Sequence, residues 1–200
     1  MNGQDGKEYR LPIGLEIQAA TDAERELPRL FAKIPFGLLT EPTPKSGNGA
    51  ARAFSIDGYG IDQWQKLFSN RQLVTLGSLV NQSRLARQAV SPDEWSEAIA
   101  AFLCLAVDRV ANRSSCLCIW NMPAEKIEQT FARFALPILW DFAESNPIES
   151  ASGSYVGEVE WVAACIEHLM IAGYARPSVS VKCMSALALV LLSMVVLVFA

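Results

Sequence analysis

Apolar positions recur at helical spacing along most of the chain. In residues 71–89, and again after Pro92, they fall at steps of three and four, as on one buried helix face. The run Ser91-Pro92-Asp93-Glu94 predicts the start of the second helix, with a Ser N-cap, Pro at the first helical position and Glu at the third. We expect that helix to end near Asn112. A further helix is predicted over residues 158–172, with Gly173 after its last turn.

The other segments predict shorter elements. Residues 1–20 show no clear period and are expected to form an extended lead-in, after which Thr21 and Glu24 form a capping box for a short helix. Residues 41–50 are a loop by composition. Three more elements are predicted: a short strand at 53–56, a short helix at 62–69, and a helix after Pro123 that is kinked or split at Pro137.

The fold class expected from this pattern is mainly α. It is an irregular multi-helix domain with at most one or two short strands, plus a C-terminal hydrophobic helix. The predicted organisation is the lead-in 1–20, a helical domain over 21–176 and a hydrophobic tail over 183–200.

The tail, residues 183–200, differs from the rest of the chain because only Ser185 and Ser193 in it are not apolar. As a helix it would span about 27 Å, at the lower edge of a bilayer crossing. Arg176 and Lys182 on its near side fit the tendency of basic residues to stay in the cytoplasm. Three interpretations stay open: an inner-membrane anchor at the C-terminus, a buried core segment, and the out-of-frame product of a frameshifted gene. Each predicts membrane association or aggregation if the tail is exposed.

Charge and cysteine content narrow the function classes. The chain has 17 basic and 21 acidic residues, which argues against a wholly basic nucleic-acid surface but leaves room for a small basic face. Five cysteines and a polar start without a secretory signal predict reduced thiols and a cytoplasmic location. Cys116 and Cys118 have no second ligand pair, and His168 is the only histidine, so we expect neither a metal site nor a nucleophilic triad. His168 itself is expected at the surface or its boundary.

Three segments have a more specific pattern. They are WQKLFSNRQL at 64–73, DRVANRSSCLCIW at 108–120 and FARFALPILWDFAESNP at 131–147. Their order and spacing resemble the helical middle region of the DUF1156-containing adenine-specific DNA methylases, over roughly residues 20–175. The run from Leu136 to Glu144 is the most distinctive part of this resemblance.

The resemblance implies S-adenosylmethionine-dependent N6 methylation of adenine in DNA, on a base flipped out of the stack. An Asp-Pro-Pro-Tyr type motif and a cofactor-binding segment belong to that family, and the chain contains neither. The resemblance therefore implies a fragment that contributes helical scaffold, with no catalytic residues and no cofactor of its own. A frameshift near Arg176 would explain the abrupt change to the apolar tail.

Five residues of these segments are candidates for contact with DNA. Arg71, Arg113 and Arg133 would meet phosphates, and Trp64 and Trp140 would stack on bases. The alternative is structural: Arg133 pairs with Asp141 or with capping groups, and the tryptophans pack in the core. The second function class left open is a small membrane-anchored helical interaction module.

Overall fold

The computed structural model describes residues 2–171 except 4, 5, 8, 9, 36, 91 and 150–152. The chain divides into two compact units, Met1–Cys165 and Ile166–Ala200. The hydrophobic tail at 183–200 and Gly173 lie outside the described residues, so the tail's three interpretations stay predictions.

The described part of the chain is mainly helical, as predicted. Its four α-helices are α1 Gly14–Phe31, α2 Asn70–Ala89, α3 Asp93–Asn112 and α4 Tyr155–Ile171. Three short 3-10 helices are η1 Gly49–Ala53, η2 Ile56–Tyr59 and η3 Trp64–Leu67. Two antiparallel hairpins, rather than one or two strands, complete it: β1 Asn2–Gly3 with β2 Gly6–Lys7, and β3 Trp120–Asn121 with β4 Lys126–Ile127.

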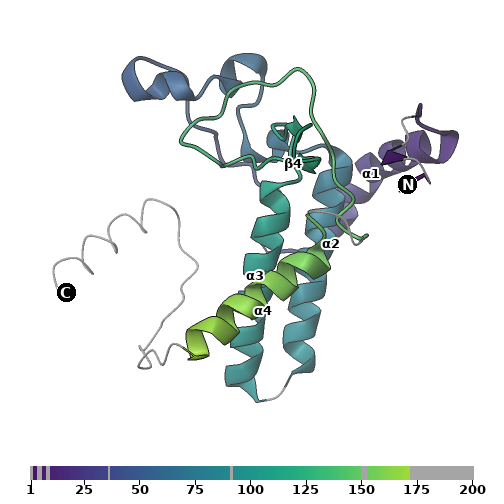
Figure 1. The fold of residues 1–200 in the computed structure, drawn as a ribbon, viewed down its shortest axis with the longest axis vertical. Helices are drawn as coiled ribbons and strands as arrows, with labels where there is room; N and C mark the ends of the chain where they lie inside the picture. The colour runs from purple at the N-terminus through teal and green to yellow at the C-terminus, as the bar shows by residue number, and fades with distance from the viewer. Residues whose placement is uncertain are drawn as a thin grey trace. The chain divides into compact units, whose positions relative to one another are not determined.

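The two long helices form the frame of the first unit. α2 and α3 run side by side, and the irregular segments gather at one end of the pair (Figure 1). α2 begins after Ser69, whose Oγ accepts the backbone N–H of Gln72 at 3.3 Å, while Gln72 Oε1 accepts the N–H of Ser69 at 2.8 Å. This reciprocal capping box satisfies two backbone donors that the helix itself cannot. The predicted end of α3 at Asn112 is confirmed.

The predicted start of α1 is wrong. The helix begins at Gly14 rather than after Thr21, so residues 14–20 are helical and not part of an extended lead-in. Glu16 supplies the start signal, since its Oε2 accepts the backbone N–H of Ile13 at 2.9 Å. Thr21 lies inside the helix, where its hydroxyl donates to the carbonyl of Ile17.

The helix predicted after Pro123 is also absent from the described residues. The segment forms the β3–β4 hairpin and then irregular chain, and Glu125 in the turn has a positive φ of 49°. Its backbone donors bind other segments instead: Glu128 N–H reaches the carbonyl of Ile119 at 2.9 Å, and Thr130 N–H that of Asn112 at 2.7 Å. Long-range hydrogen bonds thus replace the helical ones that the apolar spacing suggested.

Two buried clusters hold the elements together. Leu76, Val107 and Val110 lie between α2 and α3. The second cluster lies beneath the irregular segments and consists of Ile56, Leu67, Leu117 and Leu136. This second cluster is called here the loop core, and Phe54, Trp64 and Phe68 pack against it.

α1 packs on α2 through a close approach. A Cβ at Gly77 would lie 2.9 Å from the Leu30 side chain and 3.0 Å from the Phe31 ring, so a larger residue there would force these side chains of the α1 C-terminal turn to shift. Ala23, Leu27 and Leu30 form the buried face of α1.

Candidate nucleic-acid interface

Three pairs of aromatic rings join two segments that are far apart in the sequence. One segment covers residues 54–64 and the other residues 131–140. The pairs are Phe54–Phe134 and Tyr59–Trp140, both edge-to-face with centroids 5.0 and 5.5 Å apart, and Trp64–Phe131, tilted with centroids 6.3 Å apart. Edge-to-face rings at this distance attract each other beyond their burial.

Backbone hydrogen bonds hold the two segments in register. Leu136 N–H donates to the carbonyl of Ala53 at 2.8 Å, and Ser55 N–H donates to the carbonyl of Leu136 at 3.2 Å. They form an isolated parallel bridge between Phe54 and Leu136, and the predicted strand at 53–56 is reduced to this single bridge between η1 and η2. Leu136 also anchors the segment from below, because its side chain lies in the loop core.

A pocket of about 340 Å³ opens between these segments. Its lining residues are Phe54, Trp64, Phe131, Arg133, Phe134, Ala135 and Leu136. We call it the aromatic pocket. Its size is at the lower end of the range of small-ligand sites. The rings at its mouth are open to solvent, since Phe131 is 48% and Phe134 78% exposed.

One of the residues that line the aromatic pocket, Arg133, is positively charged. Arg133 is exposed and has no ion-pair partner among the residues that the structure describes. The same holds for exposed Arg52, which precedes the Ala53 carbonyl bound by Leu136. The Tyr59–Trp140 pair is different, because Asp141 follows Trp140 directly. Of the three ring pairs, the two that line the aromatic pocket are therefore the ones with a cation, Arg133, beside them.

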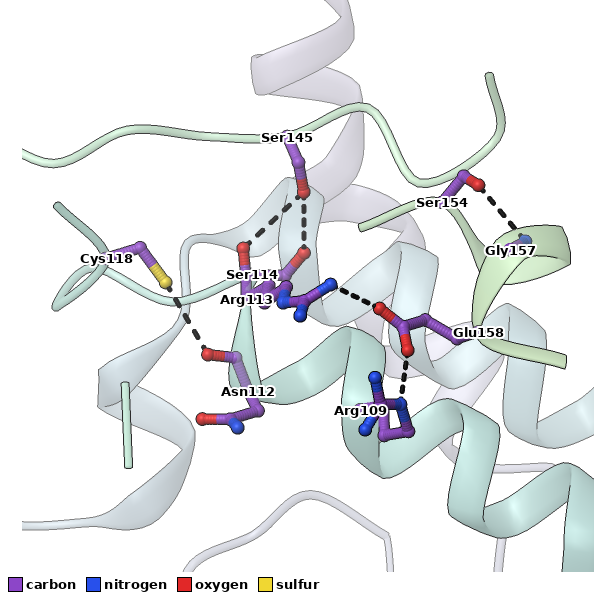
Figure 2. Close-up of polar contacts among 9 residues, drawn as sticks. All are labelled: Arg109, Asn112, Arg113, Ser114, Cys118, Ser145, Ser154, Gly157 and Glu158. Carbon is purple, nitrogen blue, oxygen red and sulfur yellow. Dashed lines mark hydrogen bonds and ion pairs between the residues drawn. The ribbon is translucent and has the colours of Figure 1, made fainter. Parts of the chain in front are cut away.

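A second polar constellation joins α3 to α4 (Figure 2). Glu158 of α4 points between Arg109 of α3 and Arg113, the C-cap of that helix. Its Oε1 binds Arg113 Nη1 at 2.6 Å, and its Oε2 binds Arg109 Nε. The Glu158 side chain is only 4% exposed, and the Arg109 guanidinium also lies 4.2 Å from the ring centroid of Trp161. The charge of Arg113 is thus compensated within the fold, and we assign this bridge a structural role.

Hydroxyl and thiol groups form hydrogen bonds at the C-terminal end of α3, beside this bridge. Ser145 Oγ lies 3.3 Å from Ser114 Oγ and donates to the carbonyl of Arg113, as Figure 2 shows. Buried Cys118 donates to the carbonyl of Asn112. Burial raises the pKa of the neighbouring Cys116 thiol, which opposes formation of a nucleophilic thiolate. The hydrogen bonds of these groups fix the chain at the C-terminal end of α3.

The structure separates the five residues proposed for DNA contact. It brings Trp64 and Arg133 together in the aromatic pocket, although they are far apart in the sequence. Arg71 binds Glu144 at 2.7 Å and Arg113 binds Glu158, so both carry a compensated charge. Trp140 lies on Tyr59, outside the pocket lining, and is 85% exposed.

The structural alternatives for these residues were core packing of the two tryptophans and pairing of Arg133 with Asp141, and the structure supports them to different extents. Trp64 packs against the loop core as well as lining the pocket, whereas Trp140 is not a core residue. No ion pair between Arg133 and Asp141 is found in the described part of the chain. Sequence reasoning missed Phe54 and Phe134, although three aromatic residues between 131 and 140 around a proline gave a signal for an exposed aromatic segment.

His168 is exposed, as expected for a surface position. Within the described residues, no cluster of three or more His, Cys, Asp or Glu side chains is arranged to hold a metal ion. None of the helices within residues 2–171 has the length and apolar character needed to cross a membrane.

No family model matches the chain, and the comparisons with curated proteins and with solved structures found no similar protein. The resemblance to adenine-specific DNA methylases therefore stays a prediction that rests on the three sequence segments.

Proposed function

We propose that this chain is a fragment of the DNA adenine-N6 methyltransferase type whose helical domain supplies scaffold and contacts to DNA. The observation that carries this proposal is the aromatic pocket. Two residues singled out for DNA contact on sequence grounds, Trp64 and Arg133, line it together.

The chemistry of the pocket suits a contact rather than a reaction. Aromatic rings stack on nucleobases, and an arginine without an acidic partner binds phosphate. The chain has no Asp-Pro-Pro-Tyr motif, so the fragment is expected to be inactive alone. S-adenosylmethionine would be the cofactor of the complete enzyme and would bind a part that this chain lacks.

The ion pairs of the fold support a choice among the three arginines. Arg71 and Arg113 would have to leave Glu144 and Glu158 to meet a phosphate, and the side chain of Glu158 is almost fully buried. Arg133 has no carboxylate partner among the described residues, so it would break no ion pair on binding a phosphate. We therefore assign DNA contact to Arg133 and Trp64, and a structural role to Arg113.

Binding of labelled DNA to the full chain tests the proposal. Fluorescence anisotropy would be measured over a series of salt concentrations, with a non-ionic detergent present because residues 183–200 are apolar. We expect Arg133→Ala to weaken binding and to reduce the slope of log K against log salt by about 0.7–0.9, the loss of one phosphate contact.

Arg84→Ala is the matched control. Arg84 is exposed on α2 and, like Arg133, forms no ion pair with any described residue. Its removal should leave both affinity and salt slope unchanged. Absence of DNA binding at low salt, or equal losses in the two variants, would contradict the proposal.

A further inference from the structure

We infer that the aromatic pocket takes one unpaired base of a single DNA strand and does not engage a duplex. This inference rests on the proposed function and specifies its ligand.

The rings form walls at different angles. Phe54 and Phe134 meet at an interplanar angle of 84°, and Trp64 and Phe131 at 58°. A flat ligand can lie against one ring while its edge meets another, which are the two favoured geometries of aromatic contact. In a duplex the faces of each base are covered by its neighbours, so only an unstacked base can present a face to such walls.

The lining also predicts how a base would be recognised. Apart from Arg133, every lining side chain is apolar or aromatic, and Trp64 adds a single ring N–H donor. Reading of base edges needs several positioned donors and acceptors. The pocket is therefore suited to stacking that tolerates any base, as in proteins that bind single strands.

The distribution of charge favours a short contact. Proteins that bind duplex DNA commonly neutralise about 6–10 phosphates. Here several helix and loop cations are already bound to carboxylates: Lys66, Arg71, Arg87, Arg109 and Arg113. Arg133, which lines the pocket, is left without a carboxylate partner among the described residues, and it supplies positive charge for a phosphate beside one base. Asp57 and Asp141 near the Tyr59–Trp140 pair disfavour extension of a phosphate backbone in that direction.

The test compares three DNA probes on the full chain under the anisotropy conditions given above. They are a mixed-sequence single strand of about ten nucleotides, the same strand in a duplex, and a strand of equal length made of abasic sites. We expect the single strand to bind more tightly than the other two. The abasic strand keeps the phosphates, so it separates stacking from charge.

Two substitutions localise the binding. Phe134→Ala should weaken single-strand binding roughly 5- to 150-fold, the loss of one stacked base. Phe134→Tyr keeps a ring and should retain the affinity of the original chain. Trp95→Ala is the control, because Trp95 is 66% exposed on α3 and does not line the pocket. At 78% exposure, Phe134 contributes little to the core, and circular dichroism would verify that the variants stay folded.

The outcomes distinguish the two proposals. A duplex that binds as tightly as the single strand, or an abasic strand that binds equally well, would overturn the single-base inference while DNA binding through Arg133 could still stand. Equal losses in Phe134→Ala and Trp95→Ala would also overturn it. A chain that binds none of the three probes would refute the proposed function itself.

Discussion

The bridge between Glu158 and two arginines makes a sharp prediction for the substitution Glu158→Gln. The variant keeps the size of the side chain and removes the charge that lies between Arg109 and Arg113. The bridge ties the part of α4 that lies in the first unit to the C-terminal end of α3, and the Arg109 guanidinium also lies over the Trp161 ring. The first residue of α4 adds a hydrogen bond from Tyr155 N–H to the carbonyl of Pro147 at 2.8 Å.

The magnitude follows from the burial of the three side chains. Glu158 is 4% exposed, and breaking a fully buried ion pair by removing one partner costs about 3–5 kcal/mol. Arg109 and Arg113 are 31% and 24% exposed, so both regain water when the carboxylate is gone. We therefore expect a smaller loss, about 2 kcal/mol in the free energy of unfolding. For a chain of this size that corresponds to about 4–8 °C in Tm.

Urea unfolding followed by circular dichroism would measure the loss, and hydrogen exchange would locate it. We expect faster exchange in α4 than in α2 or α3, because the helix loses its main polar attachment. Glu160→Gln is the control, since Glu160 is exposed on the same helix and has no ion pair among the described residues. A difference below about 0.5 kcal/mol between the two variants would refute the structural role of the bridge.

Three further predictions concern caps, thiols and pH. Ser69→Ala should cost about 1 kcal/mol in urea unfolding through loss of the α2 cap, whereas Ser78→Ala inside α2 should not destabilise. Alkylation of the native chain should modify exposed Cys104 and Cys165 and spare buried Cys118 until urea is added; early modification of Cys118 would contradict its burial. The hydrogen bond from Arg10 lowers the pKa of the Glu16 carboxyl from 4.5 to about 2, so the contact stabilises the start of α1 above pH 4.5 and is lost as the pH falls toward 2. Carboxyl NMR titration should find this low pKa, and Arg10→Gln should raise it; an ordinary pKa in the original chain would exclude the contact.

The long helices could be predicted from the sequence because their signals are local. The apolar spacing of residues 71–89 and the end of α3 near Asn112 depend on neighbours within a few turns. α1 was misplaced because two capping signals compete: Glu16 binds the N–H of Ile13 and starts the helix before Thr21. A capping box in the sequence marks a position where a helix can start. Of the two such positions in this segment, α1 starts at the one nearer the N-terminus.

The aromatic pocket could be predicted only in part. Trp64 and Arg133 were recognised as candidate contacts, but their proximity depends on the hydrogen bonds of Leu136 to residues 53 and 55. Phe131 and Phe134 are three residues apart, a spacing that also fits a helix, and only the long-range pairing excludes that helix. The ion pair between Arg113 and Glu158 could likewise not be predicted from the sequence, because Glu158 lies 45 residues further along the chain.

Photo-crosslinking tests the central claim most directly. A single strand that contains 5-iodouracil would be irradiated on the full chain, and the modified peptides identified by mass spectrometry. The account predicts crosslinks at Trp64, Phe131 or Phe134, and their loss when the strand is annealed into a duplex. Crosslinks that fall instead on Trp95 or Trp161, the exposed tryptophans of α3 and α4, would contradict it.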